Sequence, residues 1–215
     1  MPERRRALLV GATGLVGSIL LERLLDETLY NSVTVWARRP LALSGPGLKV
    51  ETFDFEHLAS HKVEADHVFC CLGTTMKQAR SQQAFRRVDH DYPVALAQAA
   101  AKGGARRLLV VSALGANPAS RVFYNRVKGE MEADVAAAGV PRTIFFRPSL
   151  LIGPRDEVRL GERIGQVAGR LLGPLLGKYR PIEAELVAAA MVNAALKRLR
   201  SGVIESEQIR KLAEK

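Results

Sequence analysis

The sequence is poor in cysteine, which narrows the classes of protein that it can encode. Its 215 residues include 2 cysteines, Cys70 and Cys71, and these are adjacent. Adjacent residues of a strand point to opposite faces of a sheet, so a disulfide between them is implausible, and their isolation fits a reducing compartment. Neither has the spacing of a metal ligand, so we predict two packed thiols and no metal site.

Long apolar runs are also missing. No stretch reaches the ~18 apolar residues that span a bilayer. The longest candidate, 186–196, is short and rich in alanine. The basic start followed by an apolar run imitates a signal peptide, but cleavage there would remove the first strand and the glycine motif within it. We therefore expect a soluble, cytoplasmic protein without a membrane partner.

Carboxylates are outnumbered by basic side chains. Lys and Arg total 32 against 22 Asp and Glu, which gives a formal charge of +10. Such an excess can mark a nucleic-acid-binding surface. The basic residues are spread in small groups, at 4–6, 38–39, 86–87, 106–107 and 197–200. We interpret most of them as solvated surface, expect no nucleic-acid partner, and keep a few as candidate ligands of an anionic cofactor.

Glycine is concentrated at one informative place. Gly11, Gly14 and Gly17 are spaced three apart between an apolar strand-like run and an apolar helix-like run. The first can make a tight turn, the second can let backbone approach a pyrophosphate, and the third can let the helix pack on the strand. The free N–H groups of the helix N-terminus would then face the anion. The motif alone leaves open a glycine-rich turn in an ordinary α/β protein.

Apolar strands and helical segments alternate along the chain, which predicts an α/β fold with a doubly wound parallel sheet and helices on both faces. The length suits one Rossmann-type domain, residues 1–215. The expected strands cover 7–11, 32–38, 49–53, 66–72, 107–112 and 143–147. The expected helices cover 15–26, 81–102 with a break near Pro93, 123–138 and 182–199, followed by a short strand and a helix capped by Ser206. Residues 153–182 show no clear strand and are expected to form a small substrate or lid region.

The tip of the second strand bears on the choice of cofactor. An Asp or Glu there accepts hydrogen bonds from the ribose 2′-OH of NAD, whereas Arg binds the 2′-phosphate of NADP. Here the tip carries Arg38 and Arg39 and no carboxylate. Two guanidinium groups can bind a phosphate with bidentate geometry, so we predict NADP(H). The alternative is a pair of solvated arginines in a turn.

Tyr124 and Lys128 lie four residues apart and share one face of the helix expected there. A nearby ammonium lowers the pKa of a phenol and makes proton exchange with a carbonyl or alcohol feasible. Ser112, at the end of the strand 107–112, could hydrogen-bond the same substrate oxygen. A Tyr and Lys pair is commonly structural, but with the glycine motif and the strand-end serine it predicts a catalytic set. The polar residues 89–91 are either helix surface or part of the cofactor cleft.

These motifs carry a family resemblance. The sequence resembles the short-chain dehydrogenase/reductase superfamily through Gly11-x-x-Gly14-x-x-Gly17 and through Ser112 with Tyr124-x-x-x-Lys128. The glycine spacing is that of the extended and atypical branches. A closer similarity, to the Tat-interacting-protein-type NADPH-binding oxidoreductases and their bacterial relatives, rests on several short stretches, of which 69–75 is the most specific. These stretches are 54–56, 69–75, 88–92, 127–130 and 146–148.

The resemblance implies a set of cofactor contacts. They are Thr13, Gly14, Leu15 and Val16 at the pyrophosphate, Arg38 and Arg39 at the 2′-phosphate, Asp54 at the adenine, Leu72 and Gly73 on the adenosine-ribose side, Lys128 at the nicotinamide ribose, and Leu151 by the nicotinamide. Gly11, Gly17, Thr74, Tyr124 and Arg159 complete the expected cofactor-binding set. The sequence differs from ordinary members of the superfamily in two places. Leu72-Gly73-Thr74 replaces their Asn-Ala-Gly, and the substrate region is short, with few polar anchors.

The sequence therefore leads to the hypothesis of an NADPH-dependent oxidoreductase acting on a small carbonyl or alcohol substrate. Tyr124 would be the general acid or base, Lys128 would lower its pKa, and Ser112 would position the substrate oxygen. One alternative is an NADPH-binding regulatory protein that presents a surface to a protein partner. Another is nucleotide-sugar epimerase or dehydratase chemistry, which the short lid region disfavours. We expect a monomer or a homodimer.

Overall fold

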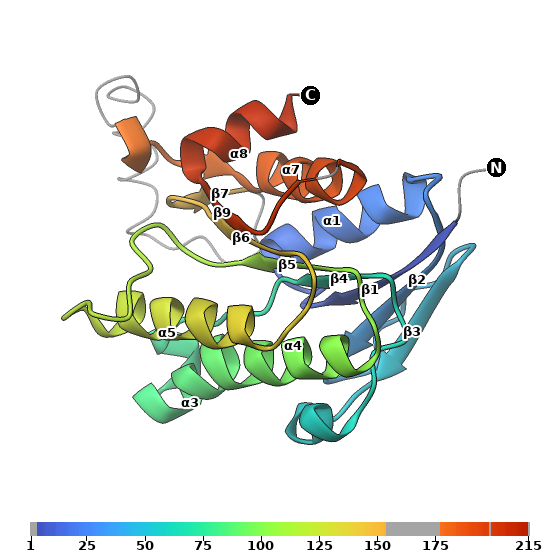
Figure 1. The fold of residues 1–215 in the computed structure, drawn as a ribbon, viewed down its shortest axis with the longest axis horizontal. Helices are drawn as coiled ribbons and strands as arrows, with labels where there is room; N and C mark the ends of the chain where they lie inside the picture. The colour runs from blue at the N-terminus through green and yellow to red at the C-terminus, as the bar shows by residue number, and fades with distance from the viewer. Residues whose placement is uncertain (1–3, 154–176, 198, 215) are drawn as a thin grey trace.

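A central parallel sheet of seven strands organises the computed structural model, which describes residues 4–153, 177–197 and 199–214 (Figure 1). The strand order is β3-β2-β1-β4-β5-β6-β9. The strands are β1 Arg5–Val10, β2 Tyr30–Ala37, β3 Leu48–Thr52, β4 His67–Cys70, β5 Arg107–Val111, β6 Thr143–Arg147 and β9 Gly202–Glu205. A second, two-stranded parallel sheet pairs β7, Leu151–Ile152, with β8, Ile182–Glu183. The predicted doubly wound α/β fold is confirmed.

Helices cover both faces of the large sheet. Figure 1 shows α1, α7 and α8 on one face and α3, α4 and α5 on the other. The α-helices are α1 Leu15–Asp26, α2 Met76–Ala79, α3 Gln82–Arg86, α4 Tyr92–Lys102, α5 Phe123–Ala137, α7 Ala184–Leu196 and α8 Ser206–Ala213. The shorter turns are η1 Phe55–Ser60, the π-helical turn η2 Arg87–Asp91, and η4 Gly177–Tyr179. In the described part of the chain, no helix combines the length and apolarity needed to cross a bilayer.

The central strands β1 and β4 contribute side chains to two hydrophobic cores, one on each face of the sheet. Leu9 and Phe69 pack into the core beneath α1 and α7, while the neighbouring residues Leu8 and Val68 pack into the core beneath α4 and α5. Successive strand residues point to opposite faces, so a strand covered on both sides must be apolar at every position. This burial explains why the central strands read as continuous apolar runs.

The path of the chain creates a crevice between β1 and β4. From β1 the chain moves outward to β2 and β3, and then crosses back to β4 on the other side of β1. The connections that leave the carboxyl ends of β1 and β4 therefore turn to opposite faces of the sheet. In open α/β sheets such a switch point is where ligands bind.

The predicted helix 81–102 does not break near Pro93 but continues through η2. Proline cannot donate to the carbonyl four residues before it, which here belongs to Asp89, and its ring clashes with that carbonyl in an α-helix. A wider turn relieves the clash, and the Tyr92 N–H instead donates to the Arg87 carbonyl, five residues back.

Two other helix boundaries differ from the prediction. The helix expected from residue 182 begins at Ala184, because the Ile182 N–H donates to the Leu150 carbonyl at 2.9 Å and residues 182–183 form β8. The last helix is capped by Glu205 rather than Ser206. The carboxylate of Glu205 accepts from the Gln208 N–H, and the Gln208 side chain accepts from the Glu205 N–H at 2.8 Å.

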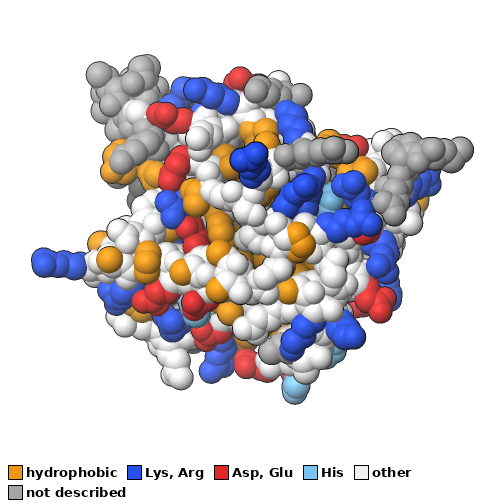
Figure 2. Space-filling model, viewed as in Figure 1, with side chains coloured by type: hydrophobic (Ala, Val, Ile, Leu, Met, Phe, Trp, Pro, Cys, Tyr) orange, Lys and Arg blue, Asp and Glu red, His pale blue; other side chains and the backbone are white. Residues whose placement is uncertain are grey.

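Basic side chains are spread over the surface. On the face shown in Figure 2, Lys and Arg lie in several separate groups with acidic and uncharged side chains between them. This distribution agrees with the small basic groups seen along the sequence.

Replacing Gly17 by Ala tests the close packing of α1 on β1. A Cβ atom at this position would lie 2.1 Å from the carbonyl oxygen of Gly11, which is backbone and cannot rotate away. We expect a loss of about 1–3 kcal/mol or more in the free energy of unfolding, measured by urea denaturation. Gly45→Ala is the matched control, because a Cβ there meets nothing within 4 Å. Equal stability of the two variants would contradict the packing argument.

Candidate functional site

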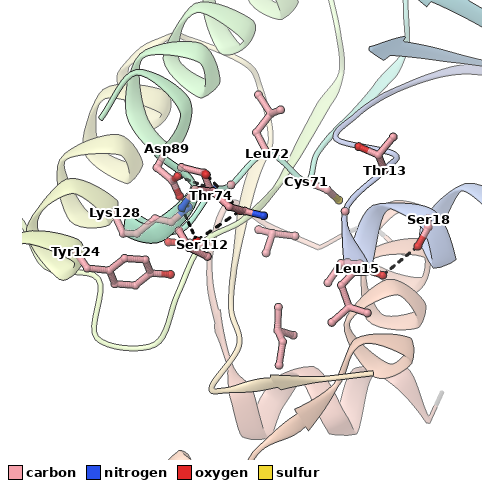
Figure 3. A pocket seen from close by; sticks show the side chains of 17 residues that line it. Thr13, Leu15, Ser18, Cys71, Leu72, Thr74, Asp89, Ser112, Tyr124 and Lys128 are labelled. Atoms are coloured by element: carbon pink, nitrogen blue, oxygen red, sulfur yellow. Dashed lines mark hydrogen bonds and ion pairs between the residues drawn. The ribbon is translucent and has the colours of Figure 1, made fainter. Parts of the chain in front are cut away.

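A cavity of about 870 Å³ lies at the carboxyl ends of β1, β4 and β5 (Figure 3). Its walls come from the turn after β1, the loop after β4, the end of β5, the helix α5 and the short strand β7. The lining residues are Thr13, Gly14, Leu15, Val16, Ser18, Cys71, Leu72, Gly73, Thr74, Thr75, Gln78, Asp89, Val111, Ser112, Tyr124, Lys128 and Leu151. The cavity therefore brings together most of the sequence-predicted site.

The turn between β1 and α1 is built from backbone. Gly11 has φ +91°, and a Cβ on it would lie 2.5 Å from the carbonyl oxygen of Cys71 at the end of β4. The Gly14 N–H donates to the Gly11 carbonyl at 3.0 Å, which closes the turn. Gly11 and Gly17 thus permit close approach without lining the cavity, while Gly14 lies at its wall. The assignments of turn-forming and helix-packing glycines agree with this geometry.

The N-terminus of α1 opens toward the cavity. Its N-cap is Gly14, which supplies no side-chain cap, and its first turn contains no acidic residue. The N–H groups at this end and the positive end of the helix dipole therefore remain available to an anion. A backbone cradle that a Cβ would fill, next to an uncapped helix, fits the pyrophosphate of a dinucleotide.

The two arginines predicted to bind the 2′-phosphate are exposed at the carboxyl end of β2. Neither lines the cavity. Arg38 lies close enough to Tyr92 to oppose the rise in the pKa of that phenol to about 12, a rise caused mainly by burial and by Glu56. Arg38 and Arg39 directly follow β2, the strand that pairs with β1.

Asp54, predicted to contact the adenine, caps η1 instead of lining the cavity. Its carboxylate accepts from the Glu56 N–H at 3.0 Å and pairs with the His57 ring at 3.0 Å. The Glu56 N–H is the main cause that lowers the pKa of Asp54. The remaining predicted contact, Arg159, lies outside the described residues.

Tyr124 and Lys128 both reach the cavity from α5 (Figure 3). Tyr124 is 38% exposed, and its ring packs against Phe85 at 5.7 Å between centroids. Lys128 is buried, and its Nζ lies 2.8 Å from Oδ1 of Asp89. The expected proximity of the phenol and the ammonium is therefore found, together with a carboxylate that the motif did not include.

The electrostatics of Tyr124 differ from the expectation. Burial raises the pKa of Tyr124, Lys128 acts in the opposite direction, and Asp89 raises the pKa further. Lys128 does favour the phenolate, as predicted, but it does not outweigh burial in the protein alone. Burial lowers the pKa of Lys128, but the charge and hydrogen bond of Asp89, together with Tyr124 and Cys70, raise it by more, so the pKa is raised overall and the ammonium is charged.

Ser112 lies at the cavity wall, but its proton is directed elsewhere. Its hydroxyl donates to Oε1 of Glu132 at 2.5 Å. Arg147 binds the same carboxylate through Nε at 2.9 Å and Nη2 at 2.5 Å, and also lies 3.1 Å from Glu205. A carboxylate held by a guanidinium is ionised and only accepts hydrogen bonds, so Ser112 must be the donor. Toward the cavity Ser112 therefore presents lone pairs, so a hydrogen bond to a substrate oxygen would be one that Ser112 accepts.

The cysteines behave as packed thiols. Cys70 is fully buried and packs in the core beneath α4 and α5, where burial raises its pKa to about 11. Cys71 is partly buried at the cavity wall, and burial also raises its pKa. Both therefore remain protonated near neutral pH and are poor nucleophiles.

The cavity is also lined by residues that the predicted site did not include, namely Ser18, Cys71, Thr75, Gln78 and Val111, and by Asp89, for which two possibilities were open. Most follow a strand end or a predicted contact by one to four positions, so the spacing of the elements could have indicated them. The two possibilities left open for 89–91 are now separated. Asp89 is buried in the cleft, His90 is buried between Asp91 and Asp134, and Asp91 is exposed.

An open parallel sheet with a glycine-rich turn after its first strand and a cavity at the carboxyl ends of its strands defines a Rossmann-type dinucleotide-binding protein. A family model described as NAD(P)H-binding matches residues 11–198. The chain belongs to this NAD(P)H-binding family.

The curated relatives support the same assignment. "Protein FMP52, mitochondrial" of Candida albicans is 31% identical over 199 residues, which cover 88% of this chain and 87% of that protein. "Protein HTATIP2" of Rattus norvegicus is 36% identical over 166 residues, which cover 74% and 68%. The predicted resemblance to the Tat-interacting-protein-type group is thereby confirmed.

The solved structures are less identical in sequence to this chain than the curated relatives are, so they are evidence for the fold alone. The structure described as "MoeE5 in complex with UDP-glucuronic acid and NAD" has a TM-score of 0.71 and 19% identity, and covers 92% of this chain and 74% of that one. The similarity confirms the Rossmann-type architecture over nearly the whole chain.

The relatives correct the expected location. FMP52 proteins from several fungi carry "mitochondrial" in their names, which overturns the cytoplasmic assignment. The prediction failed because the absence of a long apolar run and the scarcity of cysteine do not distinguish one aqueous compartment from another.

Replacing Glu132 by Ala tests the network beneath Ser112. The side chains of Glu132 and Arg147 are 8% and 22% exposed, so the variant leaves a largely buried guanidinium without its main partner. We expect a loss of about 3–5 kcal/mol in the free energy of unfolding, measured by urea denaturation. Glu64→Ala is the control, because Glu64 is 84% exposed and 3.8 Å from Arg6. A loss no larger than in the control would contradict the network's role.

Proposed function

We propose that the protein is an NADPH-dependent oxidoreductase that transfers hydride to or from a small carbonyl or alcohol substrate. One observation carries the proposal: a single cavity joins the uncapped N-terminus of α1 to the Tyr124 phenol and the Lys128 ammonium. The first feature suits a dinucleotide pyrophosphate, and the second suits proton exchange at a substrate oxygen.

The preference for NADPH rests on the tip of β2. Arg38 and Arg39 follow this strand and are exposed, and no carboxylate stands at the tip to accept from a ribose 2′-OH. A 2′-phosphate beside the turn would complement both guanidinium groups. The positive charge of this tip favours the phosphorylated cofactor over NADH.

The chain's own side chains would then position the reaction. When bound, the nicotinamide supplies or accepts the hydride. Tyr124 holds the proton that is exchanged with the substrate oxygen, and Lys128 favours its phenolate. Ser112 can accept a hydrogen bond from a substrate hydroxyl, because its own proton is bound by Glu132. Leu15 and Leu151 supply apolar wall to the same cavity and reduce the space for water.

A second candidate is an NADPH-binding regulatory protein with little turnover. Two observations favour it: the proton of Ser112 is engaged by Glu132, and burial raises the pKa of Tyr124. Both make this set a weaker proton donor than the motif alone suggests. The two functions are separated by mixing the protein and NADPH with a broad panel of carbonyl compounds and following absorbance at the nicotinamide band. Oxidation with any compound favours the enzyme, and oxidation with none favours the regulatory protein.

The double variant Arg38→Ala/Arg39→Ala tests the cofactor preference. Loss of charge-assisted hydrogen bonds to a 2′-phosphate should weaken NADPH binding by about 10- to 100-fold, while NADH binding changes by less than about threefold. Isothermal titration calorimetry with both cofactors measures the difference. Arg142→Ala is the control, because Arg142 is exposed just before β6, and three strands separate β6 from β2 in the sheet. An equal loss for the two cofactors would remove the assignment.

The variant Tyr124→Phe tests the proton-transfer role. Once the carbonyl panel yields a substrate, we expect the single-turnover rate of NADPH oxidation to fall by about 100- to 10,000-fold, since general acid catalysis contributes about this much. NADPH binding should stay within a few fold of the unmodified protein. Tyr179→Phe, whose side chain is 62% exposed, is the matched control. An unchanged rate in Tyr124→Phe would exclude the phenol from this role.

A further inference from the structure

A carboxylate outside the catalytic motif holds the Lys128 ammonium. Asp89 is 1% exposed and lies at the cavity wall. Its Oδ1 is 2.8 Å from Nζ of Lys128, and its Oδ2 accepts from the Thr74 N–H at 2.8 Å. Both oxygens are therefore engaged, one by α5 and the other by the loop that follows β4 (Figure 3). One side chain joins two walls of the cavity.

The wide turn η2 carries Asp89, and Pro93 accounts for that turn. Tyr92 donates to the Arg87 carbonyl across η2, and Pro93 has no N–H to offer the Asp89 carbonyl. Turns of this kind inside α-helices are rare and occur frequently at functional sites. Here the turn places the buried, charged side chain of Asp89 at the wall of the cavity, although an uncharged side chain would be enough to pack this helix.

Two further polar contacts join this helix to α5. Arg86 pairs with Glu130, and the Nε2 of His90 lies 2.9 Å from Asp134. Arg86 and His90 lie three residues before and one residue after Asp89, so the segment that carries Asp89 is tied to α5 next to the Asp89–Lys128 pair. The loop after β4 also packs against Asp89, because a Cβ on Gly73 would lie 3.6 Å from Oδ1 of Asp89.

We propose that Asp89 is a positioning residue, which holds the Lys128 ammonium and the loop after β4 in one arrangement and balances the charge of Lys128 next to Tyr124. The inference concerns the site of the proposed function and rests on it for the role of Tyr124. The pairing itself is a property of the protein and can be tested without turnover.

Asp89 and Lys128 have opposite effects on the pKa of Tyr124. The titratable groups facing one another here are Tyr124 and Lys128 from α5, Asp89 from η2, and Cys70 from β4. The negative charge of Asp89 disfavours phenolate at Tyr124, and that of Lys128 favours it. Removing only the charge of Asp89 should therefore lower the pKa of Tyr124, so that its phenolate forms at lower pH.

The experiment is a titration of Tyr124 by NMR in protein labelled with ¹³C at the tyrosine ring carbon that bears the hydroxyl. Tyr124→Phe assigns the resonance. In Asp89→Asn, which keeps the shape of the side chain, we expect the titration midpoint to fall by about one pH unit. Asp91→Asn is the matched control from the same turn, since Asp91 is exposed and pairs with His90 at 2.8 Å. Its midpoint should equal that of the unmodified protein.

The positioning role has a separate readout. Asp89→Ala frees Lys128 and the loop after β4 together, and we expect NADPH to bind about tenfold more weakly by isothermal titration calorimetry. Asp89→Glu, which restores the carboxylate, should recover a higher midpoint than Asp89→Asn. An unchanged or raised midpoint in Asp89→Asn would overturn the charge balance, and unchanged NADPH affinity in Asp89→Ala would overturn the positioning role.

A double variant covers the case in which Asp89→Asn does not fold. Asp89→Asn/Lys128→Met removes both buried charges at once, which proteins often tolerate. If Asp89 balances Lys128, Tyr124 titrates within about half a pH unit of the unmodified protein. A rise of a full unit would show that the charge of Lys128 was not balanced and would overturn the proposal. These titrations stand whether or not a carbonyl substrate is found, so failure of the enzymatic role and failure of the Asp89 role are distinguishable.

Discussion

The contact between two stretches of backbone underlies the whole site. The turn after β1 lies against the end of β4 so closely that a Cβ on Gly11 would reach the Cys71 carbonyl. Gly17 brings the first turn of α1 equally close to Gly11. At these two contacts there is no room for a side chain. The close packing directs the N-terminus of α1 toward the crevice between β1 and β4. These backbone contacts, of Gly11 with Cys71 and of Gly17 with Gly11, determine where the cavity lies.

A second feature is that the polar groups beneath the cavity are paired. α5 carries Lys128 and Glu132 one turn apart, and both are buried. Lys128 is matched by Asp89 and Glu132 by Arg147, so the cost of burying each charge is offset by an opposite charge and by hydrogen bonds. The helix that bears Tyr124 is thereby held to η2 on one side and to β6 on the other.

Much of the fold could be predicted from sequence, because the signals involved are local. Continuous apolar runs marked the central strands, and the glycine spacing marked the turn after β1. Tyr124 and Lys128 were found because four residues are one helical turn. The partners of Asp89 and Ser112 could not be predicted, since they depend on which helix packs beside α5 and on where Arg147 ends β6. Asp54 shows the same limit: its carboxylate is used by η1, a short turn without a periodic signal.

The small sheet of β7 and β8 has a consequence for how such proteins can diversify. Leu151 and Ile152 are hydrogen-bonded in register with Ile182 and Glu183, so the chain that leaves the cavity wall and the chain that returns to α7 are anchored side by side. The entropic cost of joining two fixed points rises only slowly with the length of the connection. The pairing of β7 with β8 therefore places little constraint on the length of the chain between them, and that length can change in evolution while the turn after β1 and the strand order of the large sheet stay the same.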